Sequence, residues 1–278
     1  MLCLTKVEVE LNLKIIMKNT IAVFSAIAIL LLTTAFSFAG KGDFYQIKIY
    51  HYSSSAQEEV IDEFLEKAYL PAMHRAGIDH IGVFKPRAST EGNKPEEKLI
   101  YVLIPFSSRK EFSKIDSKLA KDQQFQSAGA TYLDAAYTNP PYDRIESILL
   151  DAFEQNPNYG VPDLKGPKKD RIYELRSYEG HTEKISKNKI KMFNDGDEVG
   201  LFKRLGFNAV FYGEVVSGPT MPNLMYMTTF ENKADRDAHW DTFRSDAYWK
   251  ELSSLPQYQN NVSKNVTTFL YPTDYSDL

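Results

Sequence analysis

Apolar and polar residues alternate along two short stretches of the chain, and the second stretch repeats the first. Phe44–Tyr50 and Arg171–Tyr178 both place aromatic or aliphatic side chains at every other position. This period of two is typical of β-strands whose two faces differ. The order of predicted elements after each stretch is also the same: strand, helix, strand, strand, helix, strand.

The predicted elements can be given for each copy. In the first copy, strands are expected at 44–50, 78–84, 98–104 and 143–150, with a polar hairpin loop at 88–97, a first helix that ends before Pro71 and a second that begins after Ser108. In the second copy, strands are expected at 171–178, 207–216, 224–230 and 262–270, with helices at 183–205, from Asn232 through Phe243, and at 246–252. Gly196 is expected to break or kink the first of these helices.

Corresponding residues keep a slowly drifting spacing, since Tyr45, Tyr101 and Leu150 recur as Tyr173, Tyr226 and Leu270. Such drift indicates short loop insertions within a duplicated domain. The predicted domains are 44–153, a linker at 154–170, and 171–278. The predicted fold is α+β: two ferredoxin-like βαββαβ modules whose four-stranded sheets pack face to face as an intramolecular, pseudo-dimeric α+β barrel.

Strand alternation divides the side chains into two sets. Tyr45, Ile47, Ile49, Tyr173 and Leu175 are expected to meet the helices. Lys48, Tyr50, Glu174, Arg176 and Tyr178 point the other way, and they are expected to face a pocket between the two sheets. Because buried polar groups need partners or water, this set is the candidate ligand pocket.

The N-terminal region, residues 1–39, resembles an export signal. Lys18 provides a charged start, Ile21–Leu32 is an apolar run, and Ser37 and Ala39 stand where a signal peptidase reads small residues. Met17 is expected to be the true start, which would leave out Cys3, the single cysteine. Export to the periplasm or the outside is therefore expected, without stable membrane insertion after cleavage; an uncleaved anchor is the alternative.

The net charge of −4 gives no electrostatic reason to expect binding to nucleic acid. No cofactor and no metal site are expected, because the histidines lack a short metal-binding spacing. The expected partner is a small molecule, and a homo-oligomer stays open.

Three segments of the second copy resemble the NIPSNAP family. They are RIYELRSY at Arg171–Tyr178, the run Arg204–Asn232, and HWDTFRSDAYWKEL at His239–Leu252. The first copy is similar through Tyr69–Pro71 and Gly77–Phe84, although it has Gln46 and Lys48 in place of the glutamate and arginine of the landmark strand. The resemblance implies a dimeric α+β barrel and supplies no catalytic residues, so these stay unknown.

The candidate residues have structural alternatives. Glu174 and Arg176 could simply pair with each other or with Lys48 and hold the sheets in register. His51 and His181 could meet at one end of the barrel or be ordinary loop histidines, and His239 is expected to pack rather than to bind haem. Asn194–Glu198 is acidic but lacks the ligand spacing of a calcium loop.

The sequence leaves three functions open. The leading hypothesis is a NIPSNAP protein that binds a small ligand between the two sheets. The second is an enzyme of the α+β barrel group, a cofactor-free oxygenase or isomerase, with Arg176 as anchor and Glu174 as acid or base. The third is a protein-interaction module without chemistry.

Overall fold

The computed structural model describes residues 42–87 and 98–278, which form one compact unit. The expected signal and start at Met17 lie outside the described residues, as does the expected hairpin loop at 88–97. Within the described part, no helix is long and apolar enough to cross a membrane.

The first half contains four strands, with helical segments after the first and the third. Its elements are β1 (Phe44–His51), α2 (Ser55–Phe64), the π-helical turn η1 (Leu65–Tyr69), α3 (Leu70–Arg75), β2 (Gly82–Pro86), β3 (Leu99–Phe106), α4 (Arg109–Leu119), α5 (Gln123–Ala128), α6 (Ala130–Leu133) and β4 (Arg144–Ala152). The prediction that the first helix ends before Pro71 is wrong. Helical backbone continues through Pro71, which stands in α3 directly after the π-helical turn η1.

The second half has the same order of strands and helices. Its elements are η2 (Lys168–Asp170), β5 (Ile172–Glu179), α7 (Glu183–Asn194), α8 (Glu198–Arg204), β6 (Ala209–Ser217), β7 (Asn223–Phe230), α9 (Lys233–Ser245), α10 (Ala247–Ser254), η3 (Pro256–Tyr258) and β8 (Lys264–Pro272). The predicted break at Gly196 is confirmed, because α7 ends before it and α8 begins after it.

The eight strands form one closed antiparallel barrel in the order β1-β3-β2-β8-β5-β7-β6-β4. The strands of each half are neighbours, and the pairs β2–β8 and β4–β6 join the halves. Tyr45 lies opposite Leu150, and Tyr173 lies opposite Leu270, as their expected correspondence requires. The predicted α+β barrel is therefore confirmed.

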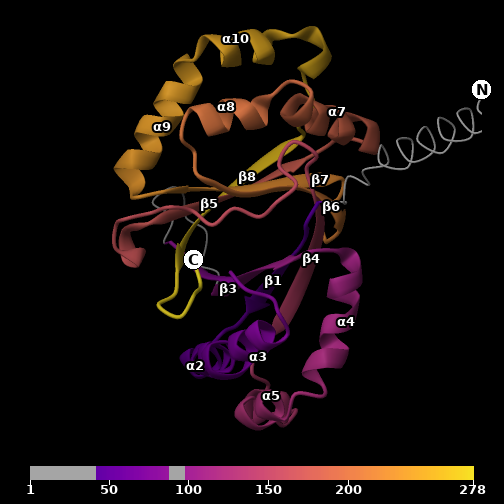
Figure 1. The fold of residues 1–278 in the computed structure, drawn as a ribbon, viewed down its shortest axis with the longest axis vertical. Coiled ribbons are helices and arrows are strands. Elements are labelled where there is room, and N and C mark those ends of the chain that lie inside the picture. Colours follow the sequence, from indigo (N-terminus) through magenta and orange to yellow (C-terminus); the bar gives the residue numbers. More distant parts are fainter. Residues whose placement is uncertain (1–41, 88–97) are drawn as a thin grey trace, which may run out of the picture. The chain divides into compact units, whose positions relative to one another are not determined.

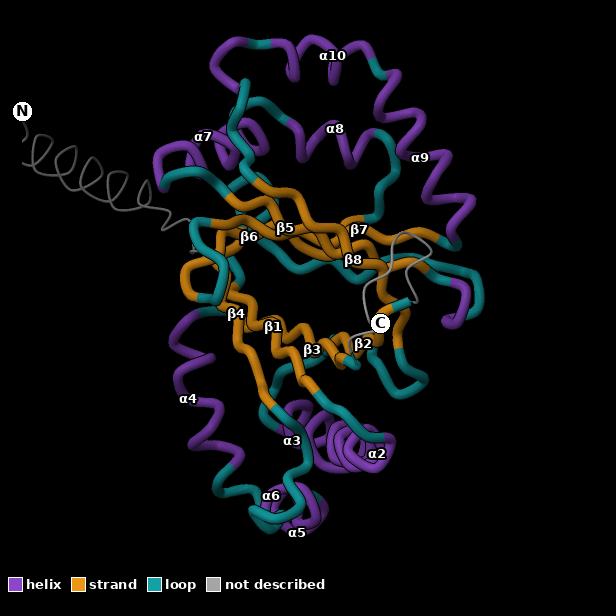
Figure 2. Tube along the Cα trace, turned by 180° about the vertical axis from the view of Figure 1, so that it is seen from behind, coloured by secondary structure: helices purple, strands orange, loops and turns teal. Residues whose placement is uncertain are grey.

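Helices cover the outside of the barrel on two sides (Figure 1). The helices α2–α5 pack against the sheet of the first half, and α7–α10 pack against the sheet of the second. From behind, the strands form a double layer between two helical layers (Figure 2). Three apolar cores result: one inside the barrel and one beneath each helical layer.

The predicted assignment of the strand faces is wrong. Tyr45, Ile47, Ile49, Tyr173 and Leu175, which were expected beneath the helices, lie in the core inside the barrel. Lys48, Tyr50, Glu174, Arg176 and Tyr178 instead face the helices, as their contacts below show. Alternation separates two faces but cannot say which is inside when both are covered. The interior of an eight-stranded barrel is just wide enough to be filled by side chains, and here the set without charged residues lies in it.

The predicted match of Tyr101 with Tyr226 is wrong by one residue, which places the two tyrosines on opposite faces. Tyr101 belongs to the core inside the barrel, whereas Tyr226 lies beneath the helices of the second half. The pairing of Phe44 with Phe106 and of Ile172 with Phe230 makes Val102 the residue that corresponds to Tyr226.

Candidate functional site

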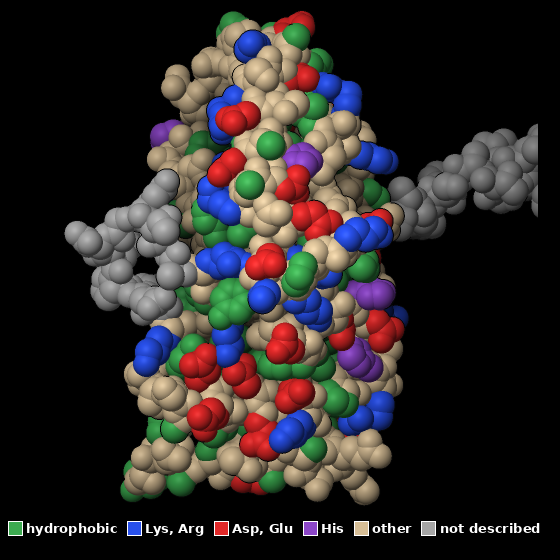
Figure 3. Space-filling model, turned by 90° about the vertical axis from the view of Figure 1, so that its left-hand side faces the viewer, with side chains coloured by type: hydrophobic (Ala, Val, Ile, Leu, Met, Phe, Trp, Pro, Cys, Tyr) green, Lys and Arg blue, Asp and Glu red, His purple; other side chains and the backbone are tan. Residues whose placement is uncertain are grey.

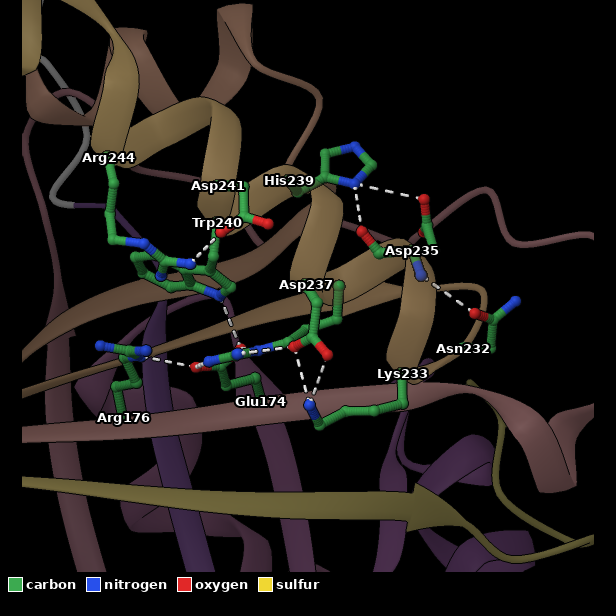
Figure 4. Close-up of polar contacts among 11 residues, drawn as sticks. Glu174, Arg176, Asn232, Lys233, Asp235, Asp237, His239, Trp240, Asp241 and Arg244 are labelled. Carbon is green, nitrogen blue, oxygen red and sulfur yellow. Dashed lines mark hydrogen bonds and ion pairs between the residues drawn. The ribbon is translucent and has the colours of Figure 1, made fainter.

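Glu174 on β5 is the centre of a buried ionic cluster. Its side chain is fully buried and accepts four hydrogen bonds from three residues. Arg176 Nε donates to Oε1 at 2.7 Å, and Trp240 Nε1 donates to Oε2 at 2.8 Å. Arg236 Nε and Nη2 donate to Oε2 and Oε1 at 2.7 and 2.9 Å. Figure 4 shows Glu174 and Arg176 reaching from β5 toward Trp240 on α9.

The cluster keeps Glu174 ionised. Burial alone would raise the pKa of this carboxyl, but hydrogen bonds from Arg236 and the charge of Arg176 outweigh burial and lower the pKa below its usual value. Both oxygens are already shared among charged and indole donors. Glu174 is therefore suited to hold Arg176 in place and unsuited to exchange protons with a ligand.

Arg176 is fixed on three sides. Besides its bond to Glu174, its Nη1 donates to the hydroxyl of Tyr178 at 3.1 Å, and its guanidinium carbon lies 4.0 Å from the ring centre of Trp240. The Tyr178 hydroxyl also hydrogen-bonds that of Tyr226 at 2.9 Å. Arg176 is thus held at a defined position against an aromatic surface, which reduces the entropy lost when it binds a partner.

A second charged pair lies beside this cluster. Lys189 on α7 donates to Glu198 Oε2 on α8 at 2.8 Å, and the two residues are 5% and 2% exposed. The Lys189 ammonium also lies 4.6 Å from the ring centre of Phe193. Burial raises the pKa of Glu198, and the neighbouring charges of Lys189 and Arg176 oppose but do not cancel this effect.

A pocket of about 250 Å³ opens between β5 and the four helices of the second half. Charged groups and aromatic rings share its wall. Its lining residues are Arg176, Tyr178, Lys189, Glu198, Phe202, Trp240, Phe243, Arg244 and Trp249. Both tryptophans of the chain belong to this wall. The pocket thus combines an apolar enclosure with a few fixed polar groups, the usual composition of a small-molecule site.

The sequence of this half matches the NIPSNAP family model over residues 173–277. The chain therefore carries a NIPSNAP domain. The matched residues include all of β5 but its first residue, all four helices around the pocket, and β6, β7 and β8. No curated protein matches the chain.

Solved structures resemble the fold of the whole described unit. A monooxygenase-like protein from Lactobacillus acidophilus is 11% identical, with a TM-score of 0.55 over 84% of this chain and 94% of that chain. A second, from Fusobacterium nucleatum, is 9% identical, with a TM-score of 0.52 over 84% and 93%. At these identities the likeness shows the α+β barrel fold alone. A NIPSNAP family protein from Agrobacterium tumefaciens is 20% identical over 39% of this chain and 98% of that chain, with a TM-score of 0.34.

The structure brings only three of the five candidate pocket residues together. Glu174, Arg176 and Tyr178 lie side by side in the NIPSNAP domain. Lys48 and Tyr50 lie in the other half, where the Lys48 ammonium is 5.2 Å from the Tyr50 ring centre. Glu174 pairs with Arg176, as the structural alternative predicts. Its other partners are Arg236 and Trp240 on α9, and Lys48 is not among them.

The other candidates do not assemble a site. No group of three or more histidine, cysteine or acidic side chains is arranged to hold a metal within residues 42–87 and 98–278. His51 contacts Glu146 at 3.0 Å. His239 packs on Phe207 and Phe230, which agrees with the expected packing role.

Lys189, Glu198 and Arg236 were not foreseen as site residues. Glu198 was noticed only as part of the acidic segment after Asn194, and Arg236 lies in a helix expected to pack by its aromatic residues. The sequence did contain a signal for Lys189. It lies three and four residues before Met192 and Phe193, so it falls on the apolar face of the helix, where a cation is unusual.

Proposed function

We propose that the NIPSNAP domain binds a small organic molecule in the pocket between β5 and α7–α10. The observation that carries this proposal is the composition of the wall: Arg176 and the Lys189–Glu198 pair stand among five aromatic rings around about 250 Å³ of space. This pocket replaces the site expected between the two sheets, because the side chains that point into that space form a hydrophobic core and include none of the candidate residues.

The wall is organised before any ligand arrives. Glu174 and Tyr178 fix Arg176, and Lys189 is held by Glu198. Charged groups that are buried without contributing to function are seldom favourable compared with apolar side chains of similar volume. Their presence around a pocket is more simply explained by a ligand that they recognise.

The two indole N–H groups make a direct test possible. In a ¹⁵N-labelled sample, Trp240 and Trp249 give the only two indole resonances, so compounds that enter the pocket should shift one or both. A screen of small metabolites, followed by titration, is expected to yield saturable shifts. Arg176→Met should weaken this binding by about tenfold or more, since bonds to charged groups contribute about 1.5–3 kcal/mol.

Lys48→Met is the matched control. Lys48 occupies the position on β1 that corresponds to Arg176 on β5, and it lies beneath the helices of the first half. It should leave the titrations unchanged. Equal loss in both variants, or a complete screen without saturable indole shifts, would contradict binding in this pocket.

An enzyme is the second candidate, and Glu198 is the observation that favours it. A buried carboxyl that faces a pocket, with a raised pKa, is a typical general acid or base. Under this proposal Glu198, and not Glu174, is the general acid or base. The two barrel structures bear monooxygenase-like names, so oxygen uptake in the presence of ligands found by the screen is the first activity to measure. Unchanged turnover in Glu198→Gln would contradict it.

We further propose that the two halves are duplicated ferredoxin-like modules and that the protein is exported. The repeated element order and the equivalent pairing of Tyr45 with Leu150 and Tyr173 with Leu270 support duplication. Export rests on the sequence of residues 1–39 alone. Mass spectrometry of the protein from its native host tests it, with a mature N-terminus at Gly40 as the expected result.

A further inference from the structure

The charges on the pocket wall favour an anion. Arg176, Lys189 and Arg244 line the pocket together with one carboxylate, that of Glu198. Two further carboxylates outside the lining, Glu174 and Asp241, pair with Arg176 and Arg244, so the unused donor of Arg176 is what favours an anion. Arg176 uses Nε for Glu174 and Nη1 for Tyr178, and its Nη2 makes no hydrogen bond within residues 42–87 and 98–278. A guanidinium held in this way can donate to a planar anionic group without rearrangement.

The remainder of the wall favours a ring. Trp240, Phe243 and Trp249 form a continuous aromatic surface, with ring centres 5.3 Å apart for the first two and 4.5 Å for the last two. Phe202 extends it, stacked on Phe243 at 4.9 Å. A space of about 250 Å³ suits a molecule of one ring with a short substituent.

We propose that the pocket takes a small aromatic carboxylate, whose anionic group is bound by Arg176 and competes with Glu198 for Lys189. This inference rests on the proposed function and adds the class of ligand. When the ligand anion takes Lys189, Glu198 loses its partner in a buried position, and it binds one proton from the solvent. Binding of the anion is therefore coupled to proton uptake.

The surroundings of Glu198 determine this coupling. Lys189 on α7 and Arg176 on β5 are the cations whose charges act on Glu198. The Glu198 carboxylate also interacts electrostatically with the hydroxyls of Tyr212 on β6 and Tyr226 on β7. Among these groups only Lys189 bonds directly to it. Burial already favours the neutral form, so the proton is bound at little cost.

The sign of the pH dependence follows. Protonated Glu198 no longer competes with a bound anion for Lys189, so affinity for an anion should rise as pH falls from 8 toward 5. A neutral ligand of the same shape should show no such rise.

The experiment titrates benzoate, benzamide and benzylamine into the ¹⁵N-labelled protein and follows the indole resonances. Benzoate is expected to bind at least about tenfold more tightly than either comparator, in line with the strength of charge-assisted hydrogen bonds. Calorimetry in two buffers of different ionisation enthalpy should show proton uptake by the native protein, a measurement that needs no variant.

Glu198→Gln supplies the second arm. It should tighten benzoate binding by about tenfold at pH 8 and flatten its pH dependence, because the competing charge is gone. Glu183→Gln, an exposed acid on the same helix as Lys189, is the control and should change neither. The amide spectrum of each variant confirms that it is folded.

The outcomes separate this inference from the proposed function. Saturable shifts with benzamide or benzylamine but not with benzoate would overturn the carboxylate and leave pocket binding intact. Benzoate binding without proton uptake, and unaffected by Glu198→Gln, would overturn the competition for Lys189. Absence of shifts with these three compounds and with every screened metabolite would overturn both proposals.

Discussion

Replacement of Glu174 by glutamine tests the ionic cluster most directly. Glu174→Gln keeps the shape of the side chain and removes its charge. Arg176 and Arg236, whose side chains are 13% and 14% exposed, would then stand close together without their shared carboxylate. The new amide NH₂ would also face groups that are all donors, so at least one hydrogen bond is lost.

The expected cost is large. Removing one partner of a buried ion pair destabilises a protein by roughly 3–5 kcal/mol, because the remaining charge stays desolvated. Two arginines lose their partner here, although Arg236 keeps a second carboxylate in Asp237 at 3.0 Å. We therefore expect a loss of about 4 kcal/mol in the free energy of unfolding. For a unit of this size the melting temperature should fall by roughly 8–16 °C.

The assay is equilibrium unfolding in urea at pH 7, followed by both circular dichroism and tryptophan fluorescence. Glu146→Gln is the matched control, since its contact with His51 at 3.0 Å is half-exposed and exposed pairs contribute about 0–1 kcal/mol. Addition of Arg236→Met to Glu174→Gln removes one of the two like charges. The double variant should therefore be more stable than the sum of the two single effects predicts, by about 1–3 kcal/mol.

The pH dependence gives an independent check. Because the pKa of Glu174 is lower in the folded protein than its ordinary value of 4.5, its ionisation stabilises the fold above that value. The difference in stability between the native protein and Glu174→Gln should be constant above about pH 5.5 and should shrink as pH falls through the lowered pKa. A cost below 1 kcal/mol at pH 7, or a difference independent of pH, would refute the reasoning.

Three smaller changes test other parts of the fold by the same urea assay. The fully buried Tyr45 hydroxyl has no hydrogen-bond partner within residues 42–87 and 98–278, so Tyr45→Phe should be neutral or stabilising, while Tyr226→Phe should cost about 1 kcal/mol; equal costs would contradict this. Gly196→Ala places a methyl group 2.5 Å from the Met192 carbonyl oxygen and should cost about 1–3 kcal/mol, and a neutral result would show that the turn has room. Ser54→Ala removes the capping box of α2 and should cost about 1 kcal/mol, and a loss within error would mean that water replaces the cap.

Local pattern was sufficient to predict the strands and their grouping. Alternation located β1 and β5 to within about a residue at each end, and Gly196 correctly marked the break between α7 and α8. These features depend on the period of a strand or on the backbone of one residue. Alternation also correctly predicted that Glu174, Arg176 and Tyr178 share one face of β5, since residues two apart on a strand point the same way.

What alternation could not supply was the side on which each face lies. In the barrel both faces of each strand are covered, one by the opposite sheet and one by helices, so neither has the polar character of a solvated surface. The error moved the predicted pocket from the helical side to the interior. Lys189 and Arg236 escaped notice for a related reason: their meeting with β5 depends on how α7 and α9 dock, which no local spacing encodes.

The surface agrees with a function located in a pocket. On the face shown in Figure 3, basic and acidic side chains are interspersed without a large patch of either sign. On that face, the mixture gives no electrostatic reason to expect attraction to nucleic acid or to an anionic membrane. The charges beneath α7–α10 differ from these in being buried, as in the pairs Arg176–Glu174 and Lys189–Glu198.

The two halves of the barrel make different use of the same strand positions. In the first half, Gln46 occupies the position of Glu174 and bonds Ser147 at 2.8 Å, so no buried carboxylate orients a cation there. Lys48, in the place of Arg176, lies over the rings of Tyr50 and Tyr69 at 5.2 and 4.9 Å. A lysine presents a point charge on a flexible stem, whereas an arginine fixed by a carboxylate presents a defined plane of donors. If the halves arose by duplication, we expect the proposed ligand binding in the NIPSNAP domain alone, while the first half contributes the other four strands of the barrel.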